Sequence, residues 1–322
     1  APNGKPMPDP DMLLLSYTGC YTFLKWFELL REQYKCPTVM LHVPYQGDGK
    51  AQITQSMRDY VIKQLKEEVI PTMEQISGIK FDIDKLREYL RNSAKAEDDL
   101  VWVLQTAKNK PSPIDGYFGA VYYIGPIFSA FRGTEDAVEY YKLLRGEIKE
   151  RLDQGLGPVT PEGEMGEEKY RLVVEGPPNW TNFREFWKMF YEDGAVCVAS
   201  SYSKVGGVYD YDGFRHDPDN PLESLADYCL GCYTNRNLPE RTQMMVDYIE
   251  EYQADGLLIN SIKSCNSFAA GELLMLREVE ARTGKPGAFI ETDLVDPRYF
   301  SPANVKNRLE SYFQMIEQKR QG

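Results

Sequence analysis

Histidine is the scarcest chemically versatile residue in this 322-residue chain, which contains only two. Zinc sites built on imidazole and Ser-His-Asp triads both need histidine at defined positions. His42 falls inside an apolar run that predicts a strand, and His216 falls in a loop after Phe214 and Arg215. We therefore interpret both histidines as structural or surface residues, and the sequence does not favour a histidine-based hydrolase.

Positive charge and long apolar runs are also in short supply. Lys and Arg total 37 against 49 for Asp and Glu, which gives a net charge of −12. Such a protein repels nucleic acid and anionic membrane surfaces on average, so we expect protein or small-molecule partners, no nucleic acid and no membrane. No apolar run reaches the about 20 residues that cross a bilayer, and the first residues lack the basic and apolar segments of a secretory signal. The expected location is the cytoplasm.

Nucleotide-binding motifs are missing as well. The chain contains no GxxxxGK[ST] and no GxGxxG after an expected strand. Gly206 and Gly207, which follow one such strand, lead into a loop rich in Tyr and Asp instead of a helix. We therefore expect that the chain itself binds no nucleoside triphosphate.

Short apolar runs alternate with amphipathic stretches, and this alternation is typical of parallel βα units. The expected strands are 12–17, 38–43, 171–176, 195–202, 256–262 and 288–293. The predicted fold class is α/β, with two parallel-sheet domains of the Rossmann or flavodoxin-like kind. Because the first run begins so close to Ala1, we expect part of the first domain to lie upstream of this sequence.

A stretch of glycine, proline and acidic residues without apolar periodicity, 154–168, predicts the domain boundary. The first α/β domain is then 1–153, with a helical insertion that covers or extends it, and the second α/β domain is 169–322. The segment 115–132 is rich in Tyr, Phe and Gly. We predict a helix there that packs closely against another surface, and it is a candidate contact with a partner protein.

Six cysteines are too few for a disulfide scaffold, and a chain without an export signal keeps its thiols reduced. They are therefore free thiols or metal ligands. Cys20 follows the first expected strand and Cys265 follows the fifth, and ligands bind in loops at the carboxyl ends of parallel strands. Cys36 and Cys197 are interpreted as core cysteines, and Cys229 as a half-buried small residue.

Cys232 forms a CxxC with Cys229, which alone is a weak signal because no second pair completes a zinc site. Three thiolates from distant parts of a chain with almost no histidine suit a soft metal centre, and iron–sulfur is the natural candidate. A cluster with three protein ligands keeps one iron open to substrate.

Further segments become informative when they are taken together. They are SYTGC after the first expected strand, PNWTNFREFWKMFYEDGAVCVASSY, PLESLADYCLGC, ADGLLINSIKSC, KPGAFIETD and the closing VKNRLESYF. In this order and spacing they cover most of the chain, and the chain resembles the family of 2-hydroxyacyl-CoA dehydratases and benzoyl-CoA reductases.

The resemblance implies an oxygen-sensitive [4Fe-4S] cluster held between two α/β domains, in a heterodimer with a homologous iron–sulfur subunit. It also implies a separate ATP-hydrolysing activator that delivers the electron, so that ATP acts only through that protein. The family's cluster cysteines match Cys20 and Cys265, and a further one looks like Cys232, with Arg236 following. Members usually carry another cluster cysteine before the position of Cys20, so the third ligand is either Cys232 or a residue upstream of Ala1.

Three functions are compared. Resemblance of the second half favours a subunit of an ATP-dependent benzoyl-CoA reductase, which transfers low-potential electrons to an aryl-CoA thioester through a ketyl-type radical. The alternative is a subunit of a 2-hydroxyacyl-CoA dehydratase, a lyase that eliminates water by a radical mechanism. A third interpretation is a non-catalytic scaffold subunit whose cysteines are merely buried.

Overall fold

The computed structural model describes residues 8–18, 21–47, 53–128, 131–205 and 214–321. They form a mixed α/β structure whose strands are β1 (Leu13–Tyr17), β2 (Thr38–His42), β3 (Val159–Thr160), β4 (Gly163–Glu164), β5 (Tyr170–Glu175), β6 (Ala195–Ser200), β7 (Gly256–Ile262) and β8 (Gly287–Thr292). None of the described helices is long and apolar enough to cross a membrane.

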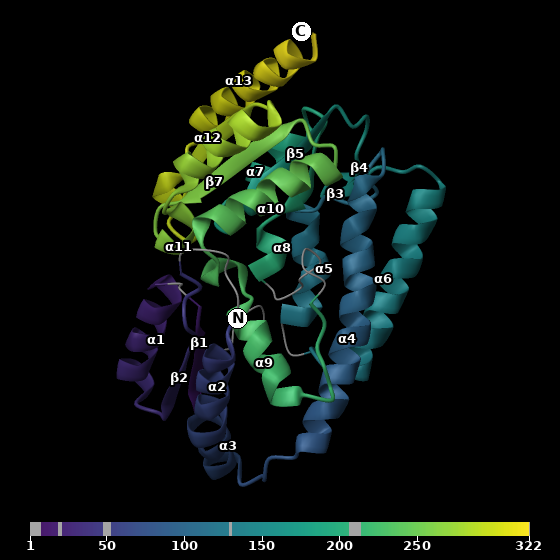
Figure 1. Cartoon of the computed structure of the whole chain (residues 1–322). Helices are drawn as coiled ribbons and strands as arrows, with labels where there is room; N and C mark the ends of the chain where they lie inside the picture. Colours follow the sequence, from purple (N-terminus) through teal and green to yellow (C-terminus); the bar gives the residue numbers. More distant parts are fainter. Residues whose placement is uncertain (1–7, 19–20, 48–52, 129–130, 206–213, 322) are drawn as a thin grey trace.

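Helices connect and cover these strands (Figure 1). In chain order they are α1 (Tyr21–Tyr34), α2 (Gln55–Gln64), η1 (Leu65–Val69), α3 (Ile70–Ser77), α4 (Ile83–Gln105), η2 (Thr106–Lys108), α5 (Phe118–Phe128), α6 (Glu135–Asp153), α7 (Phe183–Tyr191), α8 (Tyr202–Val205), α9 (Pro221–Leu230), η3 (Tyr233–Asn235), α10 (Leu238–Glu251), α11 (Asn266–Ala269), α12 (Glu272–Thr283), η4 (Pro297–Tyr299) and α13 (Pro302–Gln321).

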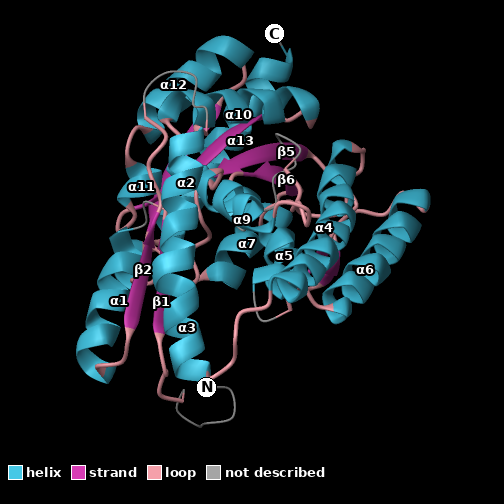
Figure 2. Cartoon of the chain, turned by 60° about the horizontal axis from the view of Figure 1, so that its bottom comes forward, coloured by secondary structure: helices cyan, strands magenta, loops and turns pink. Residues whose placement is uncertain are grey.

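All six expected strands are present, with ends that differ from the prediction by at most two residues. β1 pairs with β2 in parallel, and a second sheet has the order β6-β5-β7-β8 with every pair parallel. The two sheets lie in different parts of the molecule (Figures 1 and 2). The parallel α/β character is thus confirmed, while the division into two Rossmann-like domains stays a prediction.

The four-stranded sheet is buried on both faces. One hydrophobic cluster joins β5, β6 and β7 to α7, α13 and the start of α5, and another joins the same strands to α10 and α12 on the other side. Every residue of β6 and β7 is buried, which explains their almost continuous apolar sequence. The loops that follow the carboxyl ends of these strands are therefore where the four-stranded sheet can build a site.

Only some of the helices between residues 55 and 153 follow the expectation that they cover or extend the first domain: α2 packs on the first sheet, whereas α4, α5 and α6 pack elsewhere. α4 and α6 lie side by side (Figures 1 and 2), and together with α5 they share a hydrophobic cluster with β5–β7 and α10. The apolar stripe of α4 explains why this helix packs there, because its buried apolar residues from Ala96 to Leu104 belong to that cluster. The predicted boundary segment contains the short antiparallel pair β3–β4, which its polar sequence does not reveal.

The start of the segment 115–132 packs closely against another surface, as predicted for that segment. Gly116 approaches β6 so closely that a Cβ there would lie 2.7 Å from the Val198 carbonyl oxygen. The buried Asp115 carboxylate accepts hydrogen bonds from the backbone N–H groups of Phe118 and Cys197, at 2.6 and 3.0 Å. Burial raises the pKa of Asp115 to about 6. These contacts fix the start of α5 against the free edge of β6.

The first sheet is covered by helices from two distant parts of the chain. Val39 and Leu41 of β2 share a hydrophobic cluster with Val61 of α2 and with Ala226 and Leu230 of α9. α9 leads directly into the Cys232 segment. The packing of α9 against the first sheet therefore positions Cys232, which follows this helix.

Gly176, directly after β5, is expected to be irreplaceable. Its φ is +105°, and a Cβ would lie 2.2 Å from the Asn260 carbonyl oxygen. We expect Gly176→Ala to lower the free energy of unfolding by about 3 kcal/mol. Gly284→Ala is the matched control, because its φ is +68° but no atom lies within 4 Å, so the expected loss is about 1 kcal/mol. Equal losses for the two variants in urea titrations would contradict the steric argument.

Candidate metal centre

Two of the three cysteines predicted as metal ligands are described by the structure, and Cys20 lies outside the described residues. Cys232 is 8% exposed and Cys265 is 3% exposed. Neither of these two cysteines forms a disulfide, and both lie in short turns that precede a helix. Buried thiols of this kind are suited to a site from which water is excluded.

Cys265 lies in the turn that follows β7, at the carboxyl end of the four-stranded sheet. Its carbonyl accepts hydrogen bonds from the N–H groups of Phe268 and Ala269, at 3.1 and 2.9 Å, which start α11. The Ser264 N–H donates to Oδ2 of Asp293, just after β8, at 3.0 Å. The neighbouring strand thus holds the turn in place, as the prediction of a strand-end ligand requires.

Cys232 lies between α9 and η3. Its Sγ is 3.4 Å from Oγ1 of Thr234, and its carbonyl accepts from the Asn235 N–H at 2.9 Å. The segment after β2 contacts this turn: the Gln46 side chain donates to the Leu230 carbonyl at 2.6 Å, and the Asn235 side chain donates to the Pro44 carbonyl at 2.9 Å. The Cys232 turn therefore meets the carboxyl edge of the first sheet.

The Cys265 turn also contacts the first sheet's side of the molecule, through the helix α1 that follows β1. Oγ1 of Thr22, in the first turn of α1, donates to the Ser264 carbonyl at 2.9 Å. Thr22 is two residues after Cys20 in the sequence, and Ser264 immediately precedes Cys265. Described residues next to two of the predicted ligands are thus in contact, although they are 242 positions apart.

The donor set fits a soft metal centre. Thiolate sulfur is the ligand that iron–sulfur clusters use, and both described thiols are buried where three chain segments meet. Among the described residues, no group of three His, Cys, Asp or Glu side chains could hold a metal ion. Cys20 lies outside those residues, so the ligand set Cys20, Cys232 and Cys265 stays a prediction.

The remaining cysteines and histidines behave largely as expected. Cys197 is buried in β6, and burial raises the pKa of its thiol well above the ordinary value. Burial also raises the pKa of Cys229 to about 11, and Ser16 of β1 donates to its sulfur at 3.7 Å. The interpretation of Cys36 as a core cysteine is wrong, because it is only partly buried at the entrance to β2. His42 is exposed.

His216 is buried among polar side chains. Its Nδ1 lies 3.1 Å from Oγ of Ser224, and its Nε2 lies 3.5 Å from a Glu97 oxygen. Glu97 accepts from Arg132 at 2.9 Å. Burial lowers the pKa of His216 to about 3 and raises that of Glu97 to about 7. The histidine is therefore neutral and structural, as interpreted from the sequence.

Comparison with known proteins decides the family. A family model described as "2-hydroxyglutaryl-CoA dehydratase, D-component" matches residues 2–316. The chain belongs to this family.

Relatives within the 2-hydroxyglutaryl-CoA dehydratase family include a reductase subunit and dehydratase subunits. The whole chain is 78% identical to a benzoyl-CoA reductase subunit of Thauera aromatica over 322 residues, which are 74% of that protein. It is 30% identical over 317 residues to the (R)-2-hydroxyisocaproyl-CoA dehydratase alpha subunit of Clostridioides difficile, covering 98% of the chain and 73% of that protein. It is 25% identical over 311 residues to the alpha subunit of lactoyl-CoA dehydratase of Anaerotignum propionicum, covering 97% and 70%. The family resemblance read from the sequence is thus confirmed.

A group of buried charged residues in this family member escaped the sequence analysis. Glu175 ends β5, Arg241 lies in α10, and Glu272 starts α12, and all three are at most 5% exposed. Arg241 donates to Glu175 at 2.7 Å, whereas both carboxylate oxygens of Glu272 are buried without a hydrogen-bond partner. One signal was available, because Glu175 interrupts the apolar run RLVVEG.

Glu272 is expected to make stability depend on pH. Burial, and less strongly the neighbouring Glu175, raise its pKa to about 8, while the Arg241 charge opposes the shift. The folded state therefore holds a proton that the unfolded chain releases above its own carboxyl pKa, about 4.3. Stability should fall as pH rises from about 4 to 8, by up to about 1.4 kcal/mol per pH unit.

The isosteric variant Glu272→Gln removes this titration. We expect a flatter dependence of the unfolding free energy on pH, and a variant more stable than the parent at pH 8. Urea titrations of both proteins between pH 5 and 9 measure the difference. Parallel curves for the two proteins would show that Glu272 is not protonated in the folded state.

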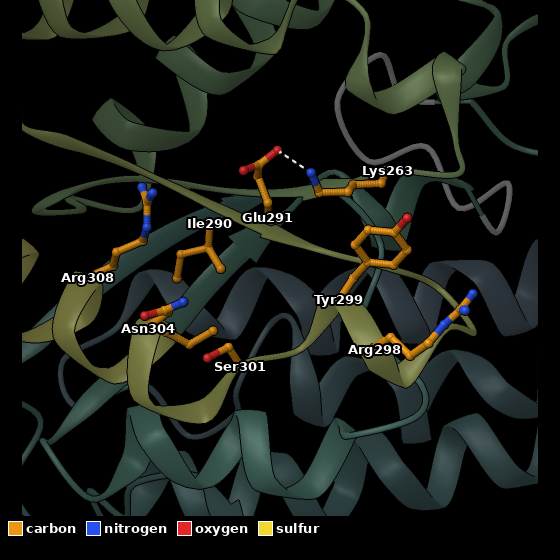
Figure 3. Close-up of a pocket in the computed structure, with 9 residues that line it drawn as sticks. Lys263, Ile290, Glu291, Arg298, Tyr299, Ser301, Asn304 and Arg308 are labelled. Atoms are coloured by element: carbon orange, nitrogen blue, oxygen red, sulfur yellow. Dashed lines mark ion pairs between the residues drawn. The ribbon is translucent and has the colours of Figure 1, made fainter.

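A basic pocket includes Lys263, which precedes Cys265 by two residues (Figure 3). It has a volume of about 270 Å³ and is lined by residues after β7, on β8, around η4 and at the start of α13: Lys263, Ile290, Glu291, Arg298, Tyr299, Ser301, Asn304, Val305 and Arg308. Three of these are cations and one is an anion, Glu291, which pairs with Lys263 at 3.0 Å. Arg298 in turn pairs with Asp296, so Arg308 is the lining cation best suited to bind an anionic ligand.

Proposed function

We propose that the chain is a subunit of an ATP-dependent benzoyl-CoA reductase. The observation that carries the proposal is a sequence identity of 78% to a protein named as a subunit of benzoyl-CoA reductase. The alignment covers all 322 residues of this chain. Relatives named as dehydratase subunits are far less similar, at 30% and 25% identity. Differences of this size favour the reductase branch of the family.

The proposed cofactor is a [4Fe-4S] cluster held by Cys20 and Cys265, with Cys232 as the third ligand from this chain. Such a cluster supplies low-potential electrons, which would reach the aryl-CoA thioester through a ketyl-type radical on the substrate. ATP would act only through a separate activator protein, and a homologous iron–sulfur subunit would be the constant partner.

The chain's own residues supply the surroundings that this chemistry needs. Burial of the Cys232 and Cys265 side chains excludes water from the thiolates. The contacts of Thr22 with the Ser264 carbonyl, and of Gln46 with the Leu230 carbonyl, hold the two turns against the first sheet. The proposed role of this subunit is therefore to position the cluster and to keep its neighbourhood dry.

The basic pocket is the proposed contact for the phosphates of the CoA ester. Arg308 uses one nitrogen to donate to the Phe289 carbonyl at 2.9 Å, and its guanidinium has further N–H groups for an anion. The pocket also lies at the carboxyl ends of β7 and β8, and its Lys263 is two residues along the chain from Cys265. A phosphate held there would keep the thioester end of the same molecule near the proposed cluster.

Replacing Arg308 by glutamine is expected to raise the KM for the CoA ester about tenfold, since one charge-assisted hydrogen bond is lost. kcat should change little, because the phosphate does not react. Lys306→Gln is the control, as Lys306 is an exposed residue of the same helix that does not line the pocket. An unchanged KM in Arg308→Gln would remove the pocket from the proposal.

Anaerobic assays of the chain, purified with its partner subunit, test the proposed reaction. With activator, ATP and benzoyl-CoA, a reductase oxidises reductant in proportion to product. A dehydratase, the second candidate because of the relatives at 30% and 25% identity, needs only catalytic priming with a 2-hydroxyacyl-CoA. A complex that contains no iron would instead support the scaffold interpretation.

A further inference from the structure

Arg241 lies between the turns that contain Cys232 and Cys265. Its Nη1 donates to the Ser267 carbonyl at 2.7 Å, two residues after Cys265. Its guanidinium lies over the ring of Tyr233, the residue after Cys232, with 4.8 Å between the guanidinium carbon and the ring centroid. One side chain thus contacts both turns.

Glu175 fixes the guanidinium in this position. Oε1 of Glu175 accepts from Nη2 of Arg241 at 2.7 Å, and Oε2 accepts from the Tyr233 hydroxyl at 2.6 Å. Glu175 is the last residue of β5, in the interior of the four-stranded sheet. The carboxylate therefore ties both Arg241 and the Cys232 turn to a central strand of that sheet.

Aromatic contacts complete the connection. The ring of Phe268, three residues after Cys265, lies 5.7 Å from that of Tyr233, and the Arg241 guanidinium carbon lies 5.6 Å from the Phe268 centroid. Glu175, Tyr233, Arg241 and Phe268 are all at most 5% exposed. A charged arginine held in this way has few alternative positions, so the separation of the two turns is fixed.

We propose that Arg241 is a positioning residue that fixes the Cys232 turn relative to the Cys265 turn, so that the two thiols could hold the proposed metal together. The inference rests on the proposed metal centre. It assigns to Arg241 no contact with substrate or metal. Its effect is exerted through the backbone of Ser267 and the ring of Tyr233.

The test compares Arg241→Lys with Arg171→Lys. Lysine keeps the positive charge beside Glu175 but lacks the planar fork that reaches the Ser267 carbonyl at the same time. Arg171 is a close match, because it is also buried and bonds to the carbonyls of Ala107, Asn109 and Tyr252 and to Glu168. It lies near the start of β5, whereas the Glu175–Arg241 pair lies at the end of that strand.

The first readout needs no metal. In the metal-free protein we expect Arg241→Lys to increase the alkylation rates of Cys232 and Cys265 by about tenfold or more, as the buried turns open more often. Arg171→Lys should leave both rates within about twofold of the parent, even where thermal unfolding reports a similar loss of stability. Site-resolved mass spectrometry measures each thiol separately. Equal protection of both thiols in the parent and in Arg241→Lys would overturn the proposal.

The second readout is iron per complex after anaerobic reconstitution with the partner subunit. Arg241→Lys should lose iron and alter the paramagnetic signal, and Arg171→Lys should retain both. If the parent complex binds no iron, the proposed metal centre is wrong, whereas the alkylation result still judges the positioning role. If Arg241→Lys keeps the parent's iron and signal, the positioning role is wrong and the metal centre stands.

Discussion

Cys265→Ala is expected to remove the cluster iron and to lower the reductase activity by more than about 100-fold, since a direct ligand should matter more than the groups that orient it. The thiol is 3% exposed in a turn held by Asp293 and by the start of α11. No other cysteine of the described residues follows β7 in the sequence, so this turn offers one thiol. Iron analysis and the visible absorption of the anaerobic complex measure the effect.

Cys197→Ala is the control for this experiment. Its thiol is fully buried, but it lies within β6 and packs with Leu172 and Val174 in a hydrophobic cluster. Its loss should cost about 1 kcal/mol of stability and no iron. Normal iron and activity in Cys265→Ala would contradict the proposed mechanism, and loss of iron in both variants would point to a folding defect instead.

The strands and the place of Cys265 were predictable because the information is local. An apolar run such as GLLINSI, bounded by Gly256 and Lys263, predicts a buried strand, and the direction of a parallel strand predicts which end carries the ligand. No long-range contact is needed for either conclusion. The structure accordingly places Cys265 at the carboxyl end of β7, as expected.

The contacts that bring the turns together were not predictable from local pattern. Thr22 and Ser264 are 242 positions apart, and Gln46 and Leu230 are 184 apart. The contact between Gln46 and Leu230 depends on how α9 packs on β2. That packing is made by a few apolar residues of α9, a helix whose sequence is otherwise ordinary and amphipathic. The sequence of an amphipathic helix does not indicate against which strand the helix packs.

Buried charges were missed for a related reason. A charged residue in a helix, such as Arg241 in α10, is usually exposed, and only its partner reveals why it is buried. That partner, Glu175, is 66 positions away. The helices α4–α6 pose the same problem, since an apolar stripe predicts burial but does not say against which sheet.

Whether this chain contributes two or three ligands to the proposed cluster depends on the role of Cys232. Its turn contacts the segment after β2 through Asn235 and Pro44, so it lies at the same edge of the first sheet as the start of α1 does through Thr22 and Ser264. A thiol at this position, 8% exposed, can serve as the third ligand beside Cys20 and Cys265.

We therefore expect Cys232→Ala to lose iron as completely as Cys265→Ala does, with activity lowered by more than about 100-fold. Cys229→Ala is the matched control, since Cys229 belongs to the same CxxC but its sulfur accepts a hydrogen bond from Ser16 of β1. Burial raises the pKa of its thiol to about 11, although the Ser16 hydrogen bond opposes the shift. That variant should keep its iron and lose only packing. Iron content and the paramagnetic signal of the anaerobic complex are measured for both. Full iron in Cys232→Ala would assign the third ligand to a cysteine outside this sequence, and with it Cys232 would become a buried structural residue like Cys197.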